Sequence, residues 1–377
     1  LLSVSHLSQD ENFFPYSVYD TVDSLPKKSA DAEVWLYRGQ LKLTSRPMRK
    51  LRLAAQYNYD ERDNKTDANS YSYILADGVP GEELINPRTN DPLSYRRQKV
   101  YLTANYRLNS KVGLRGGYEF NHINRDHDDN QRETTRENTL SAKIKVKPIP
   151  VLNFDIYVEY GERDGSTYNP RDFEHEDLRV FYLADLDRTK AGLTINYMPF
   201  SRWNFGFTTE YLKDDYTESE IGLTDSRQRS ALFNASYQVS DKISTHAFYD
   251  YKDLSSSNAN ENKEIEKGSY DVWEADLDDS SNSFGLGLNF AGLADKWDAG
   301  MDWVLTDSSG NIDMTGYRAR IDKITGDLTG TFKPIETEQF SDTKTRLNSL
   351  QLWAKYRFSD KIVYKLSYWY EHYRGEN

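Results

Sequence analysis

The stretch KAGLTINYMPFSRWNFGFTTEY, residues 190–211, decides the fold class of this chain. Its first part alternates apolar residues with small or polar ones, and the same alternation resumes after a break at residues 198–202. A period of two gives a β-strand one apolar face and one polar face. Pro199 lies in the break, where a residue without an N–H does not interrupt the hydrogen bonds between strands. The stretch therefore predicts a β-hairpin.

The same hairpin pattern recurs along the whole chain. Six more hairpins are predicted at residues 41–59, 100–120, 140–160, 231–251, 284–305 and 350–370. With a partial strand near Leu2 to Leu7, this makes about 15 strands of about 10 residues each. Long polar segments separate the hairpins, near residues 9–30, 61–97, 123–136, 162–187, 214–227, 253–281 and 307–345. Short turns at one end and long loops at the other are typical of an outer-membrane β-barrel.

Aromatic residues give a second and independent indication of a membrane barrel. One set gathers at the short-turn ends: Tyr106, Tyr197, Trp203, Tyr237, Phe290, Trp297 and Tyr356. A second set gathers at the long-loop ends: Tyr59, Phe120, Tyr160, Tyr211, Tyr251, Trp303 and Tyr370. Two such belts are expected at the two interfaces between lipid and water. The alternative is chance placement in a soluble β protein, since strands favour aromatic residues in general.

The fold prediction is therefore all-β: one large antiparallel transmembrane β-barrel over residues 1–377, with short periplasmic turns and long extracellular loops. The predicted location is the bacterial outer membrane, which the chain crosses many times in contact with lipid and lipopolysaccharide. Residue 1 already lies in a strand-like pattern, and no signal segment opens the chain. We therefore expect a fragment of a larger even-stranded barrel, with Asn377 on the cell-surface side.

Composition excludes several classes of protein. The 377 residues include no cysteine, which excludes disulfides, thiolate metal sites and covalently attached haem c in this chain. Acidic residues outnumber basic ones 60 to 48, giving a net charge of −12, which argues against a nucleic-acid partner. No run of about 18 apolar residues occurs, so the chain is not a bundle of transmembrane helices.

Catalytic and metal-binding motifs are weak. The six histidines (His6, His122, His127, His175, His246 and His372) are scattered, and no H-E-x-x-H or G-x-S-x-G occurs. We expect no enzyme activity and no cofactor held by this chain. The acidic segments 60–64 and 126–130 could bind Ca²⁺ through oxygen ligands, but they lack the spaced D-x-D-x-D-G pattern. A solvated loop is the alternative interpretation.

The polar positions of the strands should line the lumen and could contact a partner there. The predicted residues are Arg38, Arg52, Arg107, Arg115, Glu119, Lys143, Asp155, Glu159, Lys190, Glu210, His246, Asp250, Asp302 and Lys355. The alternative for any one of them is that it only keeps the inner wall wet and salt-bridged.

Several stretches resemble a known family. They are residues 203–211, 222–228, 235–242 and 169–172, and the likeness runs diffusely through most of the chain. The chain resembles the MtrB/PioB family, the decaheme-associated outer-membrane barrels. The resemblance implies a barrel that sheathes a periplasmic multihaem c-type cytochrome in its lumen and meets an extracellular one. Haem c would then belong to the partner, and electrons would cross the outer membrane for metal reduction.

Two features depart from the family. The N-terminal C-x-x-C of some members is absent, and family barrels have more strands than this chain supplies. An alternative function is a porin or a transport barrel for solutes, siderophores or lipopolysaccharide. The absence of a plug domain argues against a siderophore receptor, and the mixed lumen charge argues against a selective ion porin.

Overall fold

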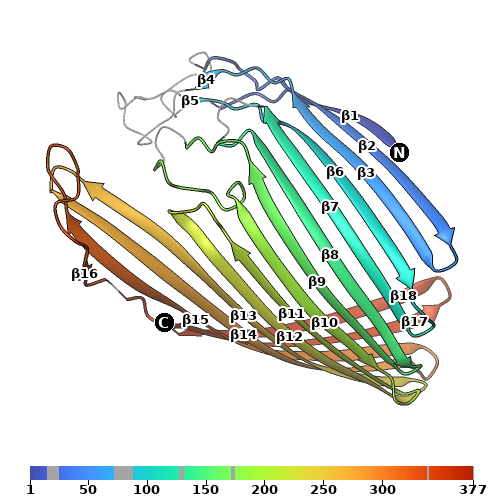
Figure 1. The fold of residues 1–377 in the computed structure, drawn as a ribbon. Helices are drawn as coiled ribbons and strands as arrows, with labels where there is room; N and C mark the ends of the chain where they lie inside the picture. The colour runs from blue at the N-terminus through green and yellow to red at the C-terminus, as the bar shows by residue number, and fades with distance from the viewer. Residues whose placement is uncertain (15–24, 72–87, 127–130, 171–174, 338, 377) are drawn as a thin grey trace. The chain divides into compact units, whose positions relative to one another are not determined.

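In the part of the chain that the structure describes, the regular elements are all β-strands. The computed structural model in Figure 1 describes residues 1–14, 25–71, 88–126, 131–170, 175–337 and 339–376. Within these residues no helix is long and apolar enough to cross a membrane. The strands are β1 (Leu2–Gln9), β2 (Ala32–Met48), β3 (Leu51–Asn64), β4 (Ser70–Tyr71), β5 (Arg88–Thr89), β6 (Ser94–Arg107), β7 (Val112–Asp126), β8 (Thr134–Ile149), β9 (Leu152–Gly165), β10 (Leu186–Tyr197), β11 (Trp203–Asp215), β12 (Gly222–Ser240), β13 (Ile243–Glu264), β14 (Ser269–Leu293), β15 (Trp297–Arg320), β16 (Lys333–Ile335), β17 (Thr343–Ser359) and β18 (Ile362–Glu376).

The strands follow one another in an up-and-down order. The main path of the sheet runs β1-β2-β3-β6-β7-β8-β9-β10-β11-β12-β13-β14-β15-β17-β18, with β16 paired to β15 and β4 paired to β5 in a separate small sheet. Fifteen strands lie on that path, so the predicted number of strands and all seven predicted hairpins are confirmed. Each of the seven hairpins joins two neighbouring strands by a short turn and is antiparallel, as the predicted barrel fold requires.

The chain divides into two compact units, which are described separately. Unit 1 comprises residues 1–104, 117–139 and 163–176, and unit 2 comprises residues 105–116, 140–162 and 177–377. In unit 1, β2 pairs with β1 and with β3. In unit 2, the strands from β10 onward form one continuous meander. The prediction of a single domain over residues 1–377 stays a prediction.

The hairpin that decided the fold class forms as its sequence predicts. In β10 and β11, Leu193 pairs with Thr209 and Thr194 with Thr208, so the apolar and polar residues of the two strands lie on opposite faces. On the apolar face the Trp203 ring stacks on Tyr237 of β12, with 4.2 Å between ring centroids. The match between neighbouring strands keeps one face apolar across the sheet.

Large apolar side chains are exposed on this face instead of being buried in a core. Phe233 is 45% exposed, Leu286 41% and Leu366 75%. A small buried cluster of unit 2 consists of Ala184, Leu186 and Tyr216. In water such an apolar surface would be costly, whereas in a bilayer it meets hydrocarbon.

The strands are longer than predicted at the long-loop end. The segment 253–281 was predicted to be a loop, and that prediction is wrong, because β13 and β14 stay paired as far as Glu264 and Ser269. Beyond the lipid both faces of a strand meet water, so the alternation ends while the backbone pairing continues. Polar cross-strand contacts replace the apolar ones there, such as the hydrogen bond from Ser257 Oγ to Asp276 Oδ1 at 2.5 Å.

The tip of β14 and β15 carries a bidentate ion pair outside the predicted membrane zone. Asp271 lies directly opposite Arg318, whose Nε and a terminal nitrogen donate to the two carboxylate oxygens at 2.6 and 2.5 Å. These hydrogen bonds from Arg318 lower the pKa of Asp271, although partial burial opposes the shift. The ionised carboxylate is therefore the form that the paired strands stabilise.

This pair predicts a pH-dependent hairpin tip. A pKa lowered by folding adds stability above the unfolded value of about 3.9, and this stability is lost as the pH falls through the folded value. Amide hydrogen exchange near Asp271, corrected for the intrinsic rate, should therefore lose protection in acid. In the Asp271→Asn variant that loss should be smaller. An identical acid response in both proteins would contradict the assignment.

The two faces predict opposite tolerance to charge. Leu193→Arg or Phe205→Arg would place a guanidinium in hydrocarbon and should cost about 2–4 kcal/mol. Thr194→Arg, on the polar face of the same hairpin, should cost less. Denaturant titrations of refolding into lipid vesicles measure the difference. Equal losses on both faces would refute the assigned faces.

Candidate functional site

The polar face of the sheet is the candidate functional site, because it collects most of the charged residues within the paired strands. In unit 1, Arg38 Nε lies 2.8 Å from Asp60 Oδ2, directly across the β2–β3 ladder. Glu119 of β7 lies 3.6 Å from Lys99 Nζ of β6. Both predicted lumen residues in these pairs are thus neutralised by a neighbouring strand.

Unit 2 pairs its polar-face charges in the same way. Lys143 Nζ lies 2.8 Å from Asp155 Oδ2, and Lys190 Nζ lies 2.9 Å from Glu210 Oε2. Two further predicted lumen residues also have partners: Asp250 lies 3.2 Å from Lys252 of the same strand, and His246 lies 3.2 Å from Asp302, which is itself a predicted lumen residue. Tyr157 also donates a hydrogen bond to Glu210. Much of the charge on the polar face is therefore paired within the chain itself, without a partner.

Other predicted lumen residues are not brought into such pairs. In the described part of the chain no ion pair joins Arg52, Arg107, Arg115, Glu159 or Lys355 to another side chain. The Lys355 ammonium instead lies 5.2 Å from the centre of the Trp353 ring. These groups are the ones that remain available to a partner.

Glycines on the polar face of unit 2 leave space that large side chains of the neighbouring strand occupy. Gly285 lies opposite Phe248 and Gly287 opposite His246, and a Cβ atom at either glycine would collide with the facing ring. The Trp353 ring covers Gly300 in the same way. Large side chains thus lie across the glycine of the neighbouring strand. The alternation of residues along one strand does not reveal these contacts, since they depend on the register between strands.

The predicted aromatic belts lie among other rings and polar groups. Trp297 lies 4.6 Å from Tyr356 between centroids, and Trp303 Nε1 donates to Asn348 Oδ1 at 2.6 Å. At the outer end of β3, Tyr59 donates to Glu61 at 2.5 Å. An apolar ring body with a satisfied polar tip suits an interfacial position.

The predicted calcium segments use their oxygens in other ways where they are described. Asp60 accepts hydrogen bonds from Arg38 and Tyr95, both at 2.8 Å. Glu61 accepts from Arg96 at 3.1 Å. Residues 127–130 of the second segment, with His127, lie outside the described residues. Calcium binding in these loops stays a prediction.

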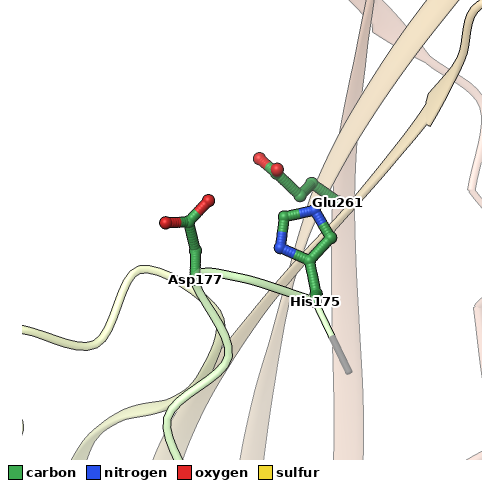
Figure 2. Close-up of side chains that lie close together, drawn as sticks. All are labelled: His175, Asp177 and Glu261. Carbon is green, nitrogen blue, oxygen red and sulfur yellow. The ribbon is translucent and has the colours of Figure 1, made fainter. Parts of the chain in front are cut away.

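Figure 2 shows a group of side chains that includes two carboxylates of unit 2, Asp177 and Glu261. One oxygen of each lies within 4.8 Å of the other. His175, also drawn there, belongs to unit 1. Two carboxylates supply few of the six to eight oxygens that Ca²⁺ takes, so they do not by themselves define a metal site.

A polar cavity of about 510 Å³ opens in unit 1 near the outer ends of β3, β6 and β7. No motif in the sequence predicts this cavity. Its wall combines carboxylates, guanidinium groups and amides: Glu61, Arg62, Asp63, Ser94, Tyr95, Arg96, Asn124, Arg125, Asp126, Glu133 and Asn169. Charges of both signs line this cavity, so it favours neither anions nor cations.

Comparisons with known proteins agree with the fold. The sequence profile of the family described as "Putative outer membrane beta-barrel porin, MtrB/PioB" matches residues 1–377. The chain is 29% identical to the outer membrane protein MtrB of Shewanella baltica (strain OS185) over 358 residues. That match covers 94% of this chain and 48% of the relative, so the chain spans about half of the relative's length.

Solved structures are more distant. The siderophore receptor PirA from Acinetobacter baumannii has a TM-score of 0.43 and 8% identity, covering 93% of this chain and 72% of that one. The FrpB iron transporter from Neisseria meningitidis (F5-1 variant) has a TM-score of 0.40 and 8% identity, covering 98% and 77%. These scores are too low to assign a function.

The contacts of the polar-face glycines predict that adding one methyl group lowers the stability of the barrel at some of these glycines and not at others. Gly285→Ala should destabilise the barrel by about 1–3 kcal/mol, because the added methyl group would force the Phe248 ring out of its position over residue 285. Gly113→Ala is the matched control, since no atom lies within 4 Å of its added Cβ. Refolding titrations compare the two variants. Equal stability would show that the ring can move without cost.

Proposed function

Because the chain belongs to the MtrB/PioB family of outer-membrane β-barrels, we propose that it sheathes a multihaem c-type cytochrome. The protein is an outer-membrane barrel, and the cytochrome would occupy its lumen. Electrons would pass along the haems between the periplasm and acceptors or donors outside the cell.

The observation that supports this function best is the construction of the polar face in unit 2. Its rings lie across cross-strand glycines, and ion pairs such as Lys190 with Glu210 hold charges against the wall. A folded protein can approach this face closely, because the large side chains lie along the sheet and few of them need to be displaced. A polar face also meets the polar exterior of a protein without burying unpaired charge.

The chain needs to supply no redox group for this function. It has no cysteine to anchor haem c, so closely spaced haems of the partner would carry the electrons. The barrel would hold that partner across a hydrocarbon layer about 30 Å thick and keep its polar surface out of lipid.

Two partners follow from this proposal. A periplasmic multihaem cytochrome would enter the lumen from the short-turn end, and an extracellular one would meet the long-loop end. The extended tips of β13, β14 and β15 would form part of the surface that faces the second cytochrome.

A porin is the second candidate function, because the matching family is described as a porin. An open lumen also has a polar wall, so the wall alone does not distinguish the two functions. The distinction lies in occupancy: a sheath is filled by protein, and a porin conducts ions.

Mild solubilisation of the barrel from native outer membranes tests the proposal. The purified barrel should carry haem absorbance and conduct few ions in a planar bilayer. Deletion of the barrel should abolish reduction of an extracellular acceptor and leave the cytochrome unstable or in the periplasm. A barrel that carries no haem protein and conducts freely would establish the porin function instead.

A further inference from the structure

Basic residues gather on the polar face of unit 2 at the short-turn end. β8 carries Lys143, Lys145 and Lys147 on this face, and successive lysines are about 7 Å apart along the strand. Between them, Ile144 and Val146 point to the apolar face. On the neighbouring strands β6 and β7, the basic residues nearest the turn on this face are Arg107 and Arg115. We name this set the basic collar: Arg107, Arg115, Lys143, Lys145 and Lys147.

The collar holds more positive charge than its surroundings neutralise. Asp155 Oδ2 lies 2.8 Å from Lys143 Nζ and 3.8 Å from Lys145 Nζ, so one carboxylate serves two ammonium groups. Within the described residues no carboxylate forms an ion pair with Arg107, Arg115 or Lys147, and all three are exposed. Their like charges repel one another while the collar remains empty.

A second group of basic residues on the same face repeats the pattern. Lys355 of β17 lies directly opposite Lys365 of β18, near the turn that joins the two strands, and opposite Asp298 of β15 on its other side. Like charges directly opposite in a ladder are destabilising. Arg357, two residues beyond Lys355, adds a further charge at this end. Asp298 offsets Lys355, whereas no ion pair within the described residues holds Lys365 or Arg357, so two basic residues remain unneutralised here in a chain whose net charge is −12.

The position of the collar favours a protein in the lumen over the lipid surface. The lysines of β8 alternate with apolar residues, so they point away from the lipid-facing side. A charged group inside a low-dielectric wall also acts at longer range than one on an open surface. The matching occupant is an acidic surface that enters from the periplasmic end.

We propose that the basic collar is the docking surface for an acidic face of the protein held in the lumen. The inference rests on the proposed function and adds the chemistry by which the partner is recognised. Carboxylates on the partner, including haem propionates at its surface, would replace the missing counter-charges of the collar. Opposite charges would also speed entry and fix the orientation of the partner.

The test compares two triple variants of the full chain in native outer membranes. The collar variant is Arg107→Gln with Arg115→Gln and Lys147→Gln, which leaves the Lys143–Asp155 pair intact. The matched control removes the same charge from exposed lysines of unit 2 at the long-loop end, with Lys323→Gln, Lys333→Gln and Lys344→Gln. Heat-dependent gel mobility confirms that both variants fold.

Two readouts follow: haem absorbance per barrel after purification, and retention on immobilised polyglutamate. The collar variant should bind polyglutamate about tenfold more weakly, with a smaller dependence on salt, and should carry less haem protein. The control should match the wild type in both. A collar variant that carries as much haem protein as the wild type would overturn the inference and leave the sheath function intact.

Three further outcomes separate the inference from the proposed function. A wild-type barrel without haem protein would contradict the sheath, while collar-dependent polyglutamate binding would still support an acidic partner. If the wild type does not bind polyglutamate either, the inference fails as well. Loss of phospholipid phosphorus from the collar variant, with unchanged haem content, would assign the collar to lipid headgroups and overturn the inference.

Discussion

Backbone hydrogen bonding in hydrocarbon is the constraint on which the rest of this structure depends. Lipid offers no partner for an N–H or C=O group, so each strand that crosses it must pair with its neighbours. The up-and-down order from β10 to β18 meets that demand by pairing each strand of the path with strands that are near it in the sequence. The same constraint gives every strand two faces, one toward lipid and one toward polar surroundings. Function is therefore confined to the polar face and to the strand tips outside the membrane.

The polar face is uneven in its electrostatics. In the middle of the sheet Lys190 and Glu210 neutralise each other, His246 lies 3.2 Å from Asp302, and rings lie across Gly285 and Gly287. At the short-turn end the basic collar has too few carboxylates of its own. The first region tolerates a close neighbour, whereas the second attracts an anionic one. Both properties are expected of a barrel that has the proposed sheath function.

Sequence alone predicted the fold because lipid imposes a strict pattern. Leu193 and Thr194 were assigned to opposite faces from alternation, and the observed register agrees. Where lipid ends the pattern also ends, so the long outer parts of β13 and β14 were mistaken for a loop. The glycine–ring pairs were also missed, because they depend on which residues of two strands stand opposite, and turn geometry sets that. The Asp271–Arg318 pair depends on register for the same reason.

Occupancy of the lumen can be measured directly, because the chain has no cysteine to interfere. Thr208→Cys places one thiol on the polar face in mid-sheet, and Thr209→Cys places one on the apolar face as a control. A charged, water-soluble maleimide should label Cys at position 208 slowly in the purified complex and rapidly once the haem protein is extracted. At position 209 it should label slowly in both states. Rapid labelling at position 208 in the untreated protein would show an open, water-filled lumen and contradict the sheath.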